Sequence, residues 1–139
     1  MRVAIQRVHP HARLPHYSRP GDAALDCYAQ ADAHLFPGEV TPVPLGFCLA
    51  IPEGHVGLIR DRSGLARKDG VYTLAGVIDP NYRGEVTALL TCLKSPVVLP
   101  AGSRVCQLLI VPAPQVIWEE VAELPSTLRG TAGFGSSGT

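Results

Sequence analysis

Residues 76–86 (GVIDPNYRGEV) combine a carboxylate, an aromatic ring and a tight turn, a set that could orient a water molecule beside a bound sugar. Asp79 precedes Tyr82 by three residues. The intervening Pro80 and Asn81 favour a turn, because proline fixes its own φ and Asn hydrogen-bonds the nearby backbone. Such a turn would hold both side chains in place. We predict that Asp79 orients the water and that Tyr82 contacts the sugar.

Two further segments suit a small anion. Arg62, Ser63 and Gly64 open a short helical pattern, and free N–H groups at a helix start, with an arginine and a serine, can bind phosphate. Ordinary capping of this helix by Ser63 is the alternative. Gln107 interrupts the apolar run 104–111. Because a buried amide needs partners, a structural glutamine and a ligand contact both remain open.

The C-terminal tail, residues 129–139 (RGTAGFGSSGT), has little to bury and would be disordered in isolation. A plain terminus, however, needs neither Arg129 nor Phe134. An arginine, glycine N–H groups and the hydroxyls of Ser136 and Ser137 can bind an anion, and an aromatic ring can stack on a base. We expect the tail to order over a ligand that carries phosphate and a base.

The charge balance bears on the class of partner. Lysine and arginine number 12, as do aspartate and glutamate, whereas a generic binder of nucleic acid or of membrane surfaces would carry a basic excess. The N-terminus is too short and too charged for a signal peptide, and no apolar run approaches the roughly 18 residues of a membrane span. The sequence predicts a soluble, cytoplasmic protein that binds neither nucleic acid nor membrane.

Metal and disulfide chemistry have weak support from the residues alone. The four cysteines lie far apart, each in or beside an apolar run, which predicts buried thiols, although a disulfide remains possible. His9 and His11 have no carboxylate or cysteine close by in the sequence, so we expect surface side chains rather than a zinc site. Asp26, at the start of a predicted strand, could face solvent or a bound cation.

The chain must position these residues with short elements, because 14 glycines and 13 prolines interrupt it at close intervals. Many short strands with regular turns predict an all-β fold, and we favour a jelly-roll-like β-barrel with one short helix at 63–68. Residues 1–128 would form the barrel, and the flexible tail, residues 129–139, would close over the site. Strands are expected at 3–8, 25–29, 40–51, 55–60, 71–74, 85–93, 104–111 and 115–121.

Five segments, taken in order, closely resemble the five signature motifs of the homotrimeric dUTPases. They are GDAALD at 21–26, RSGLA at 62–66, GVIDPNYRGEV at 76–86, RVCQLLIV at 104–111 and the tail. The resemblance runs from about residue 21 to residue 139. It implies a jelly-roll-like barrel and a Mg²⁺-dependent enzyme that hydrolyses dUTP to dUMP and pyrophosphate. Such an enzyme limits uracil incorporation into DNA and supplies dUMP for thymidylate synthesis.

The resemblance also implies a role for each residue. Asp79 would position the water that attacks the α-phosphorus, and Tyr82 would pack under the deoxyribose and reject UTP. Asp26 would contact waters of a Mg²⁺ bound by the triphosphate. In a trimer, three chains would contribute to each site. Residues implied in substrate binding are Arg62, Ser63, Gly64 and Gln107 for the phosphates; Thr73, Gly76, Val77 and Ile78 in a hairpin facing uracil; and Arg129, Phe134, Gly135, Ser136 and Ser137 in the tail.

Three positions depart from the family pattern. Ala24 replaces a glycine, Asp61 replaces a proline before RSGLA, and Thr73 replaces an asparagine found in many bacterial members. Asp61 adds a negative charge near the expected triphosphate, where it could pair with an arginine or weaken phosphate binding. Thr73 bears on the details of base recognition.

Other functions remain open. A dCTP deaminase shares the barrel and the trimer, and Glu85 would be its nearest base-pocket glutamate, but the deaminases lack the tail motif. A non-catalytic trimer that binds nucleotide or protein would not need Asp79. A structural jelly-roll would leave the Arg, Ser and Gly motifs unexplained.

Overall fold

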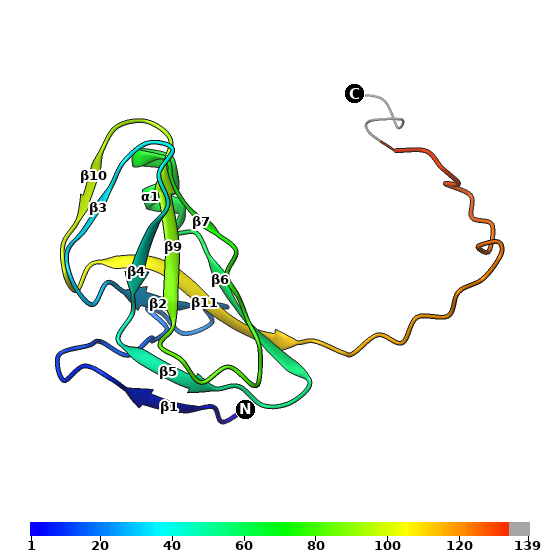
Figure 1. The fold of residues 1–139 in the computed structure, drawn as a ribbon, viewed down its shortest axis with the longest axis horizontal. Coiled ribbons are helices and arrows are strands. Elements are labelled where there is room, and N and C mark those ends of the chain that lie inside the picture. Colours follow the sequence, from blue (N-terminus) through cyan, green and yellow to red (C-terminus); the bar gives the residue numbers. More distant parts are fainter. Residues whose placement is uncertain (134–139) are drawn as a thin grey trace.

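The computed structural model describes residues 1–133 and is built almost entirely of strands (Figure 1). The one helix in this part of the chain is α1 (Ser63–Asp69). The strands are β1 (Ala4–Arg7), β2 (Leu25–Tyr28), β3 (Ala33–Leu35), β4 (Thr41–Pro44), β5 (Phe47–Ala50), β6 (His55–Arg60), β7 (Val71–Leu74), β8 (Val77–Ile78), β9 (Thr87–Cys92), β10 (Val97–Leu99) and β11 (Arg104–Pro112).

The strands form four open sheets within residues 1–133. The largest has the order β2-β11-β6-β8 and the next β4-β9-β7, while β1 pairs with β5 and β3 with β10. All these pairs are antiparallel. The predicted mostly-β class is therefore confirmed, with its single short helix, although none of the sheets closes into a ring.

A single apolar core holds the sheets together. In β5, Phe47 and Leu49 are buried while Cys48 and Ala50 are half-buried, the period of two that places alternate residues of a strand on opposite faces. Leu90 of β9 is also fully buried. Burial of this apolar surface is the main force that fixes the strands carrying the polar site residues.

The cysteines belong to this core, as the sequence predicts. All four are free, with Cys48 half-buried and the other three buried. Cys27 of β2 lies opposite Cys106 of β11, and the hydrogen bond to Cys106, followed by burial, raises the pKa of the Cys27 thiol. The Cys27 side chain therefore acts as a small apolar group that remains protonated. No helix in the described part of the chain is long and apolar enough to cross a membrane.

Several predicted elements differ from those observed. The expected strand at 40–51 is split into β4 and β5 around Gly46, which has a φ of 78° and where a Cβ would lie 2.3 Å from that of Ala12. The short strands β3, β8 and β10 were not expected as separate elements. The strand predicted at 115–121 is wrong. These residues belong to an extended arm, residues 113–133, which runs away from the sheets (Figure 1).

Candidate active site

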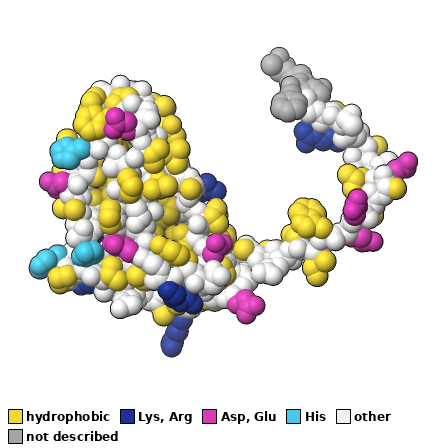
Figure 2. Space-filling model, in the orientation of Figure 1, with side chains coloured by type: hydrophobic (Ala, Val, Ile, Leu, Met, Phe, Trp, Pro, Cys, Tyr) yellow, Lys and Arg dark blue, Asp and Glu magenta, His cyan; other side chains and the backbone are white. Residues whose placement is uncertain are grey.

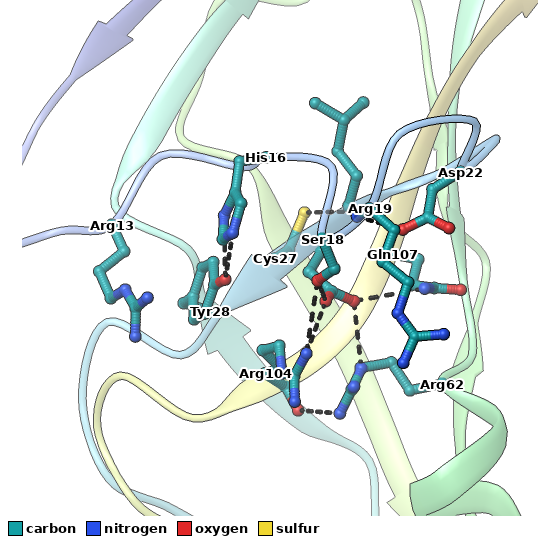
Figure 3. Close-up of polar contacts among 12 residues, drawn as sticks. Arg13, His16, Ser18, Arg19, Asp22, Cys27, Tyr28, Arg62, Arg104 and Gln107 are labelled. Carbon is teal, nitrogen blue, oxygen red and sulfur yellow. Dashed lines mark hydrogen bonds and ion pairs between the residues drawn. The ribbon is translucent and has the colours of Figure 1, made fainter.

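A buried carboxylate organises the first polar site. Asp26 of β2 is only 3% exposed, and four side chains converge on it (Figure 3). Ser18 Oγ at 2.6 Å and Arg104 Nη1 at 3.1 Å donate to Oδ2, whereas Arg62 Nε at 3.2 Å and Gln107 Nε2 at 3.3 Å donate to Oδ1. Gln107 reaches Asp26 because the two residues lie opposite each other in the β2-β11 ladder. The network leaves none of its buried polar atoms unpaired.

This network keeps Asp26 ionised. Burial would raise the pKa of the carboxyl group, but hydrogen bonds from Ser18, Gln107 and Arg104, together with the charge of Arg62, outweigh burial and lower the pKa below that of an ordinary aspartate. A buried charge of this kind is stable only when it is paired and hydrogen-bonded. Asp26 therefore acts as an anchor that fixes two arginines.

The anchored arginines face an open cavity of about 510 Å³, here called the cationic cavity. Arg19 also lines the cavity, so its three guanidinium groups outnumber its two carboxylates, those of Asp22 and Asp26. This excess of positive charge, with its fixed N–H donors, suits a phosphate-bearing ligand. Besides these five residues, Ser63, Gln107, Ser18, Ala23 and Ala24 line the cavity.

The start of α1 delivers Arg62 and Ser63 to this cavity. Arg62 is the N-cap residue, with an extended backbone (φ −95°, ψ 121°), and the helix has no side-chain cap hydrogen bond. Ser63 is the first helical residue, so the alternative in which Ser63 caps α1 is not found. Ser63 and Gly64 are both exposed. Their hydroxyl and backbone N–H groups are free of the capping role and accessible to a ligand.

A second, more apolar pocket of about 240 Å³ is lined by Asp79 and Tyr82, the two residues of the predicted turn. The Tyr82 N–H donates to the Asp79 carbonyl at 3.1 Å, which closes the predicted turn. The Asp79 side chain is exposed and Tyr82 is 48% exposed, so both can meet a ligand. The walls include Ile59, Leu74, Ala75, Gly76, Val77, Ile78, Val86, Thr87 and Leu89.

The predicted hairpin facing this pocket is wrong in its pairing. β7 pairs with β9, and β8 pairs with β6. The segment between them is thus a corner that crosses from one sheet to another. Ala75 and Gly76 turn this corner with φ values of 55° and 91°, and the Gly76 carbonyl accepts the Ile59 N–H at 2.8 Å. A Cβ on Gly76 would lie 3.0 Å from the Ile59 carbonyl oxygen, so glycine is required by both conformation and space.

Tyr82 is positioned by its own turn. Its hydroxyl donates to the Glu85 carbonyl at 3.1 Å, and its ring lies over Gly84, where a Cβ would approach Tyr82 Oη to 2.3 Å. Glu85 itself does not line the apolar pocket. Its carboxylate accepts the Gly46 N–H at 2.8 Å, a structural role that does not suit the glutamate of a deaminase.

The remaining predicted residues lie elsewhere. Thr73 is not among the residues that line the apolar pocket, and its hydroxyl donates to Asp61. Arg129 lies in the arm, where its Nε donates to the Ala132 carbonyl at 2.9 Å. The predictions for Phe134, Gly135, Ser136 and Ser137 fall outside the described residues.

The sequence places Arg104 among the cationic groups that suit a small anion without giving it a specific role, and it predicts no role for Ser18 or Arg19. Arg104 carried a signal, because it opens the fourth motif. Ser18 and Arg19 carried none, since their place in the cationic cavity depends on long-range packing.

The donor set constrains how a metal could bind. Residues 1–133 contain no group of three His, Cys, Asp or Glu side chains that could hold a metal ion. The four hydrogen bonds to Asp26 fill about all the acceptor positions of a carboxylate. A metal-bound water could reach Asp26 only if one donor gave way. The site suits a Mg²⁺ held chiefly by ligand phosphates and waters rather than by a protein cage.

Comparison with known proteins places the chain. A family model described as dUTPase matches residues 10–138. The chain is 41% identical to the deoxyuridine 5'-triphosphate nucleotidohydrolase of Dictyoglomus turgidum, over 99% of both chains. It is 43% identical to the same-named protein of Gloeobacter violaceus, over 99% of this chain and 97% of that one.

Solved structures give the same result. A mutant dUTPase of Staphylococcus bacteriophage 80alpha, described with dUpNHpp, matches with a TM-score of 0.90 and 25% identity over 99% of both chains. A dUTPase from phage phi11 of S. aureus, described with a structural Mg(II) ion, shares the fold with a TM-score of 0.82 and 22% identity, over 91% of this chain and 100% of that one. A match to the family model over nearly the whole length, and relatives that align from end to end, establish that this chain belongs to the dUTPase family.

Proposed function

We propose that this chain hydrolyses dUTP to dUMP and pyrophosphate through attack of water on the α-phosphorus. The observation that carries the proposal is the exposed Asp79 carboxylate beside Tyr82 in an apolar pocket, on a chain that also holds the cationic cavity. The relatives' names and the dUpNHpp of the phage enzyme support the same substrate. The enzyme would limit uracil incorporation into DNA and supply dUMP for thymidylate synthesis.

The apolar pocket would take the nucleoside. Asp79 would accept a hydrogen bond from the attacking water. Carboxylates in general are weak bases, so much of the effect would come from orientation of the water. Tyr82 would lie under the deoxyribose and exclude a 2′-hydroxyl. Backbone groups of the corner at Gly76, Val77 and Ile78 would meet the uracil edge.

The cationic cavity would take the phosphates. Arg62, Ser63, Gly64 and Gln107 would donate to the triphosphate oxygens. Mg²⁺, when bound to the triphosphate, would supply charge neutralisation and fix the conformation of the chain of phosphates. Asp26 would hold the arginines in place, and its predicted contact with a metal-bound water remains part of the proposal. In the tail, Arg129, Gly135, Ser136 and Ser137 would bind the γ-phosphate and Phe134 would lie over the base.

Two observations support the proposed homotrimer with shared sites. The cationic cavity and the apolar pocket of one chain are separate cavities with no lining residue in common, which would allow the cavity of one chain to face the pocket of another. Figure 2 shows hydrophobic side chains along the arm. Among the arm's apolar side chains, Ile117 is 95% exposed and Trp118 is 89% exposed. An apolar groove of about 390 Å³, lined in part by Val3, Ile5 and Leu108, offers cover for such side chains from another copy.

We also propose that the enzyme acts in the cytoplasm.

The proposal is tested by pyrophosphate release with Mg²⁺ from dUTP, dCTP, dTTP and UTP in parallel, with ammonia measured in the dCTP sample. Release from dUTP alone is expected. Ammonia from dCTP would indicate the deaminase instead. No release from any nucleotide, by protein of trimeric mass, would leave a nucleotide-binding module.

Tyr82→Ala should narrow the preference for dUTP over UTP by about tenfold, because the ring that excludes the 2′-hydroxyl is gone. The measurement is the ratio of kcat/KM for the two nucleotides. An unchanged ratio would place sugar selection elsewhere.

Gly84→Ala should shift the same ratio in the same direction, because the added methyl overlaps the Tyr82 ring. The double variant Tyr82→Ala/Gly84→Ala is the control. If the methyl acts only through the ring, the double variant matches Tyr82→Ala alone. Additive effects would show that Gly84 acts independently of Tyr82.

A further inference from the structure

Two positions that depart from the family pattern contact each other. Asp61 Oδ1 accepts the backbone N–H of Thr73 at 2.6 Å and the Thr73 hydroxyl at 2.7 Å. Asp61 therefore pairs with neither of the arginines anchored by Asp26. Both short hydrogen bonds end on one oxygen of the carboxylate, an acceptor that forms stronger hydrogen bonds than a neutral oxygen does. Because one of them involves the main chain, the pair fixes the course of β7 as well as a side-chain rotamer.

The contact joins the segment that leads into the cationic cavity to the segment that leads into the apolar pocket. Asp61 directly follows β6 and directly precedes Arg62 of the cationic cavity. Thr73 lies in β7, the edge strand of the β4-β9-β7 sheet, two residues before Ala75 of the apolar pocket. The Asp61 side chain thus caps an edge N–H that has no further strand beside it.

The corner at Ala75 and Gly76 is consequently held on both sides by one short stretch of chain, residues 59–61. The Ile59 N–H donates to the Gly76 carbonyl, and two residues later Asp61 accepts the Thr73 N–H. Between these anchors, Ala75 adopts a φ of 55°, which is unfavourable for a residue with a Cβ. Strained residues of this kind persist where the surroundings hold them, and they cluster at ligand sites.

We propose that Asp61 and Thr73 are positioning residues that fix the corner at Ala75 and Gly76 against the end of β6. Neither needs to touch the substrate. The pair sets where the backbone groups at Gly76 and Val77 lie when uracil binds. This role rests on the proposed function, and it extends that function to two residues whose side chains point at each other.

The test is a set of variants assayed on dUTP and dCTP. Asp61→Ala loses both hydrogen bonds and should lower kcat/KM for dUTP about tenfold, mainly through KM, a modest effect because the pair is exposed. It should also narrow the preference for dUTP over dCTP. Thr73→Val loses only the hydroxyl bond and should cost about threefold. In the Asp61→Ala background, Thr73→Val should cost nothing further, because its partner is already gone.

Two controls separate positioning from charge and from general stability. Asp61→Asn keeps an acceptor oxygen without the charge and should retain most of the activity. Asp32→Ala is the matched control, since Asp32 is an exposed aspartate that accepts a backbone N–H, from Ala101 at 2.8 Å, away from both cavities. It should leave both kinetic constants unchanged.

Each other outcome overturns the inference. Wild-type kinetics for Asp61→Ala, additive effects in the double variant, or an Asn variant as impaired as Ala would each do so. A fall in kcat/KM with an unchanged dUTP to dCTP ratio would reduce the pair to a structural role. A wild-type enzyme inactive on dUTP would instead overturn the proposed function, so the two failures are distinguishable.

Discussion

Asp79→Asn is expected to lower kcat for dUTP by about a thousandfold and to leave nucleotide affinity nearly unchanged. Asparagine has the same shape as aspartate, so the turn closed by the Tyr82 N–H and the Asp79 carbonyl should persist. The amide, however, orients an attacking water poorly and cannot accept its proton. The side chain is exposed in the apolar pocket, and its removal leaves no buried charge.

The measurement combines steady-state pyrophosphate release with calorimetric binding of dUpNHpp. Asp32→Asn, a remote change of the same kind, is the control and should behave as wild type. Turnover retained by Asp79→Asn would remove this carboxylate from the mechanism. Loss of affinity together with turnover would show that Asp79 binds substrate rather than water.

A chain that ends at Arg129 is expected to lose activity by at least about a hundredfold. It should still assemble to the trimeric mass, and its melting temperature should stay nearly unchanged. The described residues beyond Arg129 make only local hydrogen bonds, between Gly130 and Thr127 and between Ala132 and Arg129. The sheets therefore do not depend on them. The measurements are sedimentation, thermal melting and pyrophosphate release, and a dissociated or melted protein would make the tail structural.

Mixing two inactive chains tests whether the tail serves another subunit. Full-length Asp79→Asn supplies tails, and the truncated chain supplies Asp79. If each site draws these parts from different chains, trimers re-formed from the mixture should regain a fraction of the wild-type activity. A mixture as inactive as its parts would confine Asp79 and the tail to one chain.

Local features were predictable from the sequence because their causes are local. The turn at Asp79 and Tyr82 follows from Pro80 and Asn81, and the short helix after Arg62 was placed within one residue. The free, mostly buried cysteines also follow from their apolar surroundings.

What the sequence did not reveal depends on partners far along the chain. Arg104 and Asp26 are 78 residues apart, and Asp61 and Thr73 are 12 apart, so no local pattern pairs them. The strand β8 has two residues, too few for a visible alternation. Residues 115–121 have the composition of a strand, but a strand forms only where another lies beside it, and no other part of residues 1–133 lies there.

The Asp26 network has a consequence for how affinity responds to mutation. Because one buried carboxylate already orders two arginines and an amide during folding, a phosphate ligand meets preorganised donors and loses little side-chain entropy on arrival. The same strands, β2 and β11, also carry the core residues Cys27 and Cys106. A substitution that loosens this part of the core should therefore weaken phosphate binding well before it unfolds the protein, so that affinity becomes a sensitive gauge of core packing.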